Sequence, residues 1–297
     1  MLVQTKLNIK MNEKNKEPKF KCLILDIKSP KNSFNGKILG LELSEWVKFA
    51  CDGYKVQIVE YDKKTNIIDF AKNYIEKDDD YTLVLLSITP LLQKHTIKDI
   101  CEYATFKNIN LCKLQCGYVL KNEYILNSDT YNVDSIYTQN IEDFYVVESK
   151  AQFNFAYKIL QSRINDFHLK NGVDLVSPDM TYIEPFVDIE SGVKIFPNNS
   201  IKGKSTIKKD VILKENNVIE DSKIGVGSCI SASEIQSSVI STNVYIASFC
   251  SIKNSLVGSD VTIENGVSIN NYNVAQNQKI KANSVLGETN DSNSGIR

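Results

Sequence analysis

Histidine is scarce in this sequence of 297 residues, which contains only His95 and His168. Long apolar segments are lacking too: no run of about 18 apolar residues occurs, so we expect no membrane-spanning helix. The N-terminal residues contain no apolar core of the length that a secretory signal needs. We therefore expect a cytoplasmic protein without a membrane span.

An excess of charge of one sign is also missing, since 35 basic and 36 acidic residues leave a formal net charge of −1. The two signs are well mixed along the chain, and no basic stripe with interleaved aromatic residues occurs. A nucleic-acid partner is therefore not expected.

The seven cysteines are scattered and odd in number. In a chain long enough to build its own core, this pattern predicts reduced, buried thiols rather than a disulfide framework. Cys112 and Cys116 are one residue too far apart for a CxxC pair, and histidine partners are few. We predict no metal site from the cysteines.

A six-residue period is the strongest pattern that the sequence does contain. A large aliphatic residue recurs at every sixth position: Ile183, Ile189, Ile195, Ile201, Ile207, Leu213 and Ile219. This period fits neither a helix nor a hairpin sheet, and it is typical of a hexapeptide parallel β-helix, a prism with three flat sides. We place the β-helix at 173–287 and expect five to six coils.

The end of the β-helix is less regular. The rhythm is interrupted at 270–278, where we expect a projecting loop. The polar residues 288–297 have the composition of a disordered tail.

The residues before the β-helix predict an α/β domain at 19–147. β-rich runs at 20–27, 55–61, 81–88 and 111–120 are separated by helix-period segments, which implies a mainly parallel sheet with helices on its faces. Residues 1–18 read as a disordered tail. A connecting helix is expected at 148–172, with a packing stripe at helical spacing: Phe153, Ala156, Tyr157, Leu160, Ile164 and Phe167.

Two segments, RINDFHLKNGVDLVSPDMTYIEPFVDI at 163–189 and VTIENGVSINNYNVAQNQKIKANSVLG at 261–287, carry a family resemblance. They resemble the bacterial bifunctional N-acetylglucosamine-1-phosphate uridyltransferase / glucosamine-1-phosphate N-acetyltransferase family. The resemblance implies a shortened nucleotidyltransferase-like first domain, a left-handed β-helix and a homotrimer. It would also imply Mg²⁺ and acetyl-CoA as cofactors.

The first domain departs from the family at each catalytic motif. Its first strand and the residues after it read CLILDIKSPKNSFNGKIL. This stretch lacks the early glycines whose backbone amides cradle nucleotide phosphates in the family, and it lacks the family's arginine. Ile88 stands where the family has a metal-binding aspartate, and Gln115 where it has an asparagine ligand. Lys37 is the one matching phosphate-binding lysine, although a solvated surface charge is the alternative. We expect uridyl transfer to be lost.

The β-helix departs from the family as well. Amine acetylation needs a general base, and the family's histidine is missing because neither histidine lies in a predicted coil. Lys253 replaces an arginine that binds sugar phosphate, and so keeps the charge without the bidentate fork. Asn271 and Tyr272 match an Asn-Tyr pair near the acyl-CoA site; a corner packed on its neighbour is the alternative. We name no catalytic residue.

Three functional hypotheses follow. The first is a divergent sugar-nucleotide-pathway protein that binds a sugar phosphate, sugar nucleotide or acyl-CoA, or regulates aminosugar metabolism of the cell envelope. The second is an active transferase that uses groups outside the family motifs. The third is a structural trimeric scaffold.

Overall fold

The computed structural model describes residues 18–27 and 36–287. The predicted tails, 1–18 and 288–297, lie outside the described residues apart from Pro18. The chain divides into two compact units, Met1–Ala156 and Tyr157–Arg297, and each is described by itself. In the part of the chain that is described, no helix is both long and apolar enough to cross a membrane.

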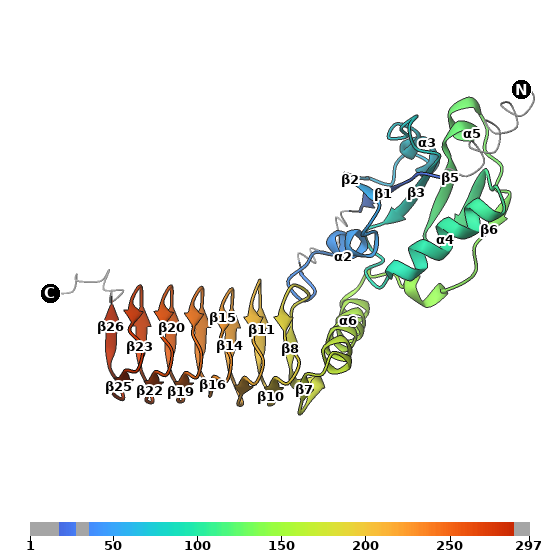
Figure 1. Cartoon of the computed structure of the whole chain (residues 1–297). Coiled ribbons are helices and arrows are strands. Elements are labelled where there is room, and N and C mark those ends of the chain that lie inside the picture. Colours follow the sequence, from blue (N-terminus) through green and yellow to red (C-terminus); the bar gives the residue numbers. More distant parts are fainter. Residues whose placement is uncertain (1–17, 28–35, 288–297) are drawn as a thin grey trace, which may run out of the picture. The chain divides into compact units, whose positions relative to one another are not determined.

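The first unit is built on one six-stranded sheet with the order β2-β1-β3-β5-β4-β6 (Figure 1). Its strands are β1 Phe20–Asp26, β2 Lys55–Glu60, β3 Tyr81–Leu86, β4 Leu111–Leu114, β5 Gly117–Lys121 and β6 Ser135–Ile136. β1 pairs in parallel with both β2 and β3. β1 and β3 read as nearly continuous apolar runs because both of their faces are buried.

Helices cover both faces of this sheet. They are α2 Leu43–Ala50, α3 Ile67–Lys72, α4 Lys94–Phe106 and α5 Asn122–Asn127, followed by the short 3₁₀ helix η1 Ile141–Phe144. The side chains of α2 and α4 join one buried cluster with alternate strand residues. Those of α3 and α5 join the other cluster. The unit is thus a three-layer α/β fold, as predicted.

One predicted strand of the first unit is wrong. The run 111–120 is not a single strand but the two strands β4 and β5, which pair antiparallel and are joined by a turn at Gln115 and Cys116. Gly117 permits this arrangement: its φ is +130°, and a Cβ there would lie 2.1 Å from the carbonyl oxygen of Val84. The sheet is therefore mixed, since β5 also pairs antiparallel with β3.

Helix α6, Lys150–Lys170, leads into the β-helix. Leu160 of its predicted stripe is buried, and Ile164 packs against the core of the coils. Gly172, with φ +86°, ends the helix in the left-handed conformation that a C-terminal cap requires. Phe167 was expected in the packing stripe, but its side chain is 63% exposed.

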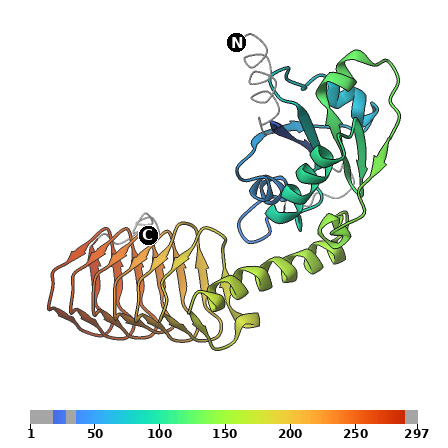
Figure 2. The same ribbon diagram turned by 45° about the vertical axis from the view of Figure 1, so that its right-hand side comes forward.

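The second unit is a left-handed parallel β-helix with three flat sides (Figure 2). Side 1 consists of β7 Asp174–Leu175, β10 Lys194–Ile195, β13 Ile212–Leu213, β16 Cys229–Ile230, β19 Tyr245–Ile246, β22 Thr262–Ile263 and β25 Lys279–Ile280. Side 2 consists of β8 Tyr182–Ile183, β11 Ser200–Lys202, β14 Val218–Glu220, β17 Glu234–Gln236, β20 Ser251–Lys253, β23 Ser268–Asn270 and β26 Val285–Gly287. Side 3 consists of β9 Asp188–Ile189, β12 Thr206–Ile207, β15 Lys223–Ile224, β18 Val239–Ile240, β21 Leu256–Val257 and β24 Asn273–Val274.

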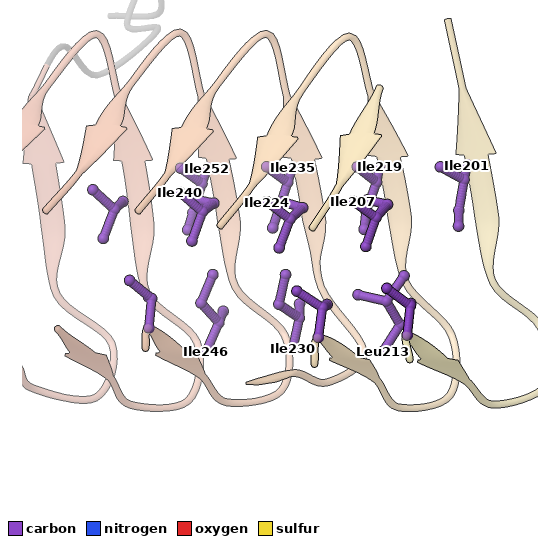
Figure 3. Close-up of a cluster of buried hydrophobic side chains, with 14 of the residues drawn as sticks. Ile201, Ile207, Leu213, Ile219, Ile224, Ile230, Ile235, Ile240, Ile246 and Ile252 are labelled. Atoms are coloured by element: carbon purple, nitrogen blue, oxygen red, sulfur yellow. The ribbon is translucent and has the colours of Figure 1, made fainter. Parts of the chain in front are cut away.

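The periodic aliphatic residues fill the prism. Ile201, Ile219 and Ile235 stack from coil to coil on side 2, in register and fully buried (Figure 3). Each such side chain contributes roughly 1.5–3 kcal/mol relative to an exposed one. The strands make six complete coils, with two sides of a seventh, which is more than the five to six that were predicted.

The predicted loop at 270–278 is also wrong. β24 continues the coil there and pairs with β21, so that Val274 is buried beneath Val257. From the second coil onward, the corners use residues with positive φ, among them Asn254 and Asn271 on the corner between sides 2 and 3. Asn adopts this conformation more readily than most residues, which explains why a polar sequence can still continue the prism.

Candidate functional site

The carboxyl ends of parallel strands are where α/β sheets usually bind ligands, and in the first unit β3 ends beside Ser87 and Ile88. The backbone oxygen of Ile88 accepts a hydrogen bond from the amide of Val147 at 2.8 Å. The Ser87 hydroxyl accepts one from the Ile27 amide at 3.0 Å. Ile88 is 9% exposed and offers no side-chain oxygen to a metal.

The other sequence-predicted residues of this domain lie on separate elements. Lys37 is exposed, next to Ile38, whose backbone oxygen accepts a 2.9 Å hydrogen bond from the Trp46 indole. Gln115 is exposed in the turn between β4 and β5. Among the described residues, no group of three or more histidine, cysteine or acidic side chains could hold a metal ion. At the two positions that the resemblance assigns to Mg²⁺, Ile88 has no side-chain donor, and Gln115 lies in the exposed turn on another element.

In the β-helix, Lys253 ends β20 on side 2. Its Nζ lies 3.2 Å from Oε1 of Glu234, one coil earlier on β17. Both side chains are more than one third exposed, so the pair is screened by solvent and worth little to stability. The Glu234 carboxylate nevertheless offsets part of the positive charge of the Lys253 ammonium group.

Asn271 and Tyr272 lie one coil beyond Lys253, at the corner between sides 2 and 3. The backbone oxygen of Lys253 accepts hydrogen bonds from the Asn271 amide at 3.1 Å and from the Ser255 hydroxyl at 2.6 Å. The Tyr272 amide donates to the Ser255 hydroxyl at 3.1 Å. The structure thus brings Lys253, Asn271 and Tyr272 together, through backbone hydrogen bonds between coils.

This corner contains a ladder of serine hydroxyls that sequence reasoning missed. Each hydroxyl accepts a hydrogen bond from the backbone amide of the equivalent residue in the next coil. The Ser222 amide donates to the Ser205 hydroxyl at 3.2 Å, and the amides of Ser238 and Ser255 donate to the hydroxyls of Ser222 and Ser238, both at 3.1 Å. Tyr272 ends the ladder, with a side chain that is 43% exposed. A serine that recurs every 16 to 17 residues is the sequence pattern that could have predicted this ladder.

The two histidines lie outside the coils. His168, on α6, is buried, and burial lowers its pKa. Neither its Nδ1 nor the buried Oδ1 of Asn165 has a hydrogen-bond partner. His95 is exposed on α4, and its Nε2 lies 3.9 Å from the carboxylate of Asp143, which accepts hydrogen bonds from Gln93 and Thr96. The coils thus contain an exposed Tyr272 but no imidazole.

Comparisons with known proteins agree with this fold. The family of the GMPPB C-terminal domain matches residues 178–289. The bifunctional protein GlmU of Clostridium acetobutylicum is 30% identical over 227 residues, which are 75% of this chain and 49% of that protein. GlmU of Caldanaerobacter subterraneus is 37% identical over 112 residues, 38% of this chain and 24% of that protein.

Among solved structures, the acetyltransferase domain of PglB from Neisseria gonorrhoeae is 13% identical and covers 89% of this chain and 96% of that one. Its TM-score of 0.28 is too low to support a conclusion. The chain spans about half the length of the GlmU protein of Clostridium acetobutylicum. The resemblance predicted from the sequence is confirmed: over three quarters of its length, the chain is a relative of the bifunctional GlmU proteins.

Proposed function

We propose that this chain is a divergent protein of sugar-nucleotide metabolism that binds a sugar phosphate or sugar nucleotide without transferring a uridyl or acetyl group. Its role would be regulatory, in the aminosugar metabolism that supplies the cell envelope. The observation that carries the proposal is Ile88: a buried aliphatic side chain occupies the position at which the resemblance expects a metal-binding carboxylate.

The loss of acetyl transfer is supported by the positions of the histidines. Acetylation of an amine requires a base that removes a proton as the bond to the acetyl carbon forms. In the family, a histidine of the coils has this role. The imidazole of His168 is buried on α6, and His95 lies on α4. Neither is on a strand or corner of the β-helix, so the proposed site at Lys253 lacks a base.

Ligand binding is proposed for the corner at which Lys253, Asn271 and Tyr272 meet. Lys253 supplies a positive charge on a flexible stem, and Tyr272 supplies an exposed aromatic face. A sugar phosphate fits this combination, since its anion can approach the ammonium group while its ring packs on the phenol. Lys37 is proposed as a second phosphate contact in the first unit. Acyl-CoA is the other ligand class for Asn271 and Tyr272.

The assembly is proposed to be a homotrimer, and the location the cytoplasm. The resemblance to trimeric enzymes supports the first proposal, and the free, mostly buried cysteines support the second.

An active transferase is the second candidate, and one observation favours it. The exposed imidazole of His95 has a buried carboxylate, Asp143, behind it at 3.9 Å. A carboxylate that orients an imidazole is a common arrangement in catalytic bases. Under this candidate, a substrate would bind at the start of α4 in the first unit rather than at the β-helix.

The test is a thermal-shift panel with UTP, UDP-N-acetylglucosamine, glucosamine-1-phosphate and acetyl-CoA, run on the wild type and on Lys253→Met. We expect a shift with at least one sugar compound and a smaller shift in the variant. No shift with any compound would remove the binding proposal and leave a structural scaffold. Release of pyrophosphate or free CoA that His95→Gln abolishes would instead establish the active transferase.

A further inference from the structure

On side 1 of the β-helix, the row of outward residues that precede the buried aliphatic residues is apolar only in the middle coils. In coils three, four and five, these outward residues are Ile212, Cys229 and Tyr245, respectively. Ile212 is 39% and Tyr245 44% exposed. We call these three residues the side 1 patch. The same row is charged toward both ends of the prism, with Asp174 and Lys194 in coils one and two and Lys279 in coil seven.

Phe249 projects from the corner between sides 1 and 2, in the fifth coil. Its side chain is 79% exposed, and its φ of +64° is in the left-handed region, which is strained for a bulky residue. The equivalent corner residues of other coils are mostly ones that adopt this conformation easily: Asn198, Asn216, Gly266 and Asn283. Strain retained at one exposed position is a reason to look for a function there.

The neighbours of Phe249 leave its ring uncovered. Its amide donates to the backbone oxygen of Ala232 in the preceding coil at 2.8 Å, and the equivalent residue of the next coil is Gly266. A large aromatic side chain thus stands between two of the smallest residues. The result is an isolated aromatic knob on a corner of the prism, at the same coil as Tyr245 on side 1.

Threefold symmetry determines what such a knob can meet. The outward directions of three sides of a triangular prism differ by 120°, and a threefold axis parallel to the prism turns each copy by 120°. No two sides then face each other directly. Instead, a corner of one copy points at a side of the next copy. That side is always one of the two numbered sides that form the corner: a corner between sides 1 and 2 meets side 1 or side 2 of the neighbour. The corner with Phe249 therefore meets side 1 or side 2 of its neighbour.

We propose that Phe249 of one copy packs against the side 1 patch of the next copy and anchors the assembly. Side 1 is favoured over side 2 because the outward residues of side 2 in coils four and five are Glu234 and Ser251. Rotation about the axis involves no shift along it, so that Phe249 of coil five meets Tyr245 of coil five. The inference rests on the proposed homotrimer and names the contact that holds it together.

The decisive variant is Phe249→Asn, because asparagine accepts the left-handed corner better than phenylalanine does. Sedimentation equilibrium over a range of concentrations should show assembly weakened by about tenfold or more in dissociation constant. At concentrations where both proteins are dissociated, the variant should unfold at the same or a higher temperature than the wild type. If Phe249 only stabilised the fold of its own chain, Phe249→Asn would lower the unfolding temperature together with the strength of assembly. Phe106→Ser removes another exposed aromatic residue and is the matched control, with unchanged assembly expected.

A second readout is the reactivity of Cys229. In the assembly, the neighbour's Phe249 would cover this thiol, so its alkylation should be slow in the wild type and several-fold faster in Phe249→Asn. Assembly of Phe249→Asn at wild-type strength, with equal Cys229 reactivity, would overturn the inference and leave the homotrimer standing. Loss of assembly in Leu256→Ser but not in Phe249→Asn would assign the contact to side 3. A wild type that stays monomeric would refute the homotrimer itself.

Discussion

Lys253 and Glu234 form an ion pair between successive coils, with 3.2 Å between Nζ and Oε1. The pair places a negative charge beside the one lysine of the proposed corner site. A phosphate that binds Lys253 must therefore compete with, or displace, the carboxylate. A site for strong phosphate binding would instead hold the phosphate with two hydrogen bonds from an arginine, without a carboxylate beside it.

Glu234→Gln should therefore strengthen the binding of whichever anionic ligand the thermal-shift panel identifies. An exposed pair of this kind is worth about 0.2–1 kcal/mol, so an improvement of up to about fivefold in dissociation constant is expected by calorimetry. The matched control is Glu264→Gln, which removes the partner of Lys279, 2.9 Å away on side 1. Equal affinities in the wild type, Glu234→Gln and Lys253→Met would exclude Lys253 from the site.

Ile88→Asp should destabilise the first unit without creating a metal site. A carboxylate at a position that is 9% exposed loses much of its hydration, and the apolar contacts of the isoleucine are lost as well. We expect the free energy of unfolding to fall by about 3 kcal/mol, against about 1 kcal/mol for the control Ile88→Val. The measurement is urea unfolding at neutral pH with and without Mg²⁺. Recovery of stability in Ile88→Asp on addition of Mg²⁺ would show that the new carboxylate completes a metal site and would contradict this prediction.

His168 should make the junction of α6 with the first coil sensitive to acid. Burial lowers its pKa below the ordinary value of 6.5, so the folded state favours the neutral imidazole. An unfolded chain takes up the proton near pH 6.5. The stabilisation is therefore complete above that pH and is lost as the pH falls from 6.5 toward the folded-state pKa.

Hydrogen exchange of the first-coil amides, such as that of Thr181, measures this effect between pH 7.5 and pH 5. After correction for intrinsic rates, protection should decline with acidity in the wild type and in His95→Gln. It should decline less in His168→Gln, which has no titrating group at that position. Identical pH dependence in both variants would rule out His168 as the cause.

The buried thiols should be inert in the native protein. Burial raises the pKa of Cys101 to about 12 and that of Cys112 to about 11, and the neighbouring Cys51 raises the pKa of Cys22. Only the thiolate attacks alkylating reagents, so these cysteines should remain unmodified at pH 8 until the chain is unfolded. Mass spectrometry of alkylated peptides gives the pattern. Rapid labelling of Cys101 in the folded protein would show that the α4 layer is open.

The prism was predictable because its side chains repeat at a fixed spacing and face inward. Ile201, Ile207 and Ile219 are all buried at their expected positions. The error at 270–278 arose because one aliphatic residue, Val274, continues the core amid polar neighbours. The hairpin of β4 and β5 was signalled by Gly117, whose lack of a side chain permits the close approach to Val84. A glycine inside an apolar run is a turn signal that was overlooked.

Contacts between residues far apart in the sequence could not be predicted in this way. Asp143 and Thr96 are 47 residues apart, and nothing in either local pattern indicates that their side chains meet. The Glu234 carboxylate beside Lys253 depends on the coil register, which the sequence gives only after each five- or six-residue step is assigned. The positions of Lys253, Asn271 and Tyr272 relative to one another required the structure for the same reason.

We propose that the β-helix has been retained while the transferase chemistry has been lost. The most direct test measures pyrophosphate release from UTP with N-acetylglucosamine-1-phosphate, and CoA release from acetyl-CoA with glucosamine-1-phosphate, using purified full-length chain and Mg²⁺. We expect no release above the rate without protein. Turnover in the usual enzymatic range of about 1–10³ s⁻¹ in either assay would contradict it.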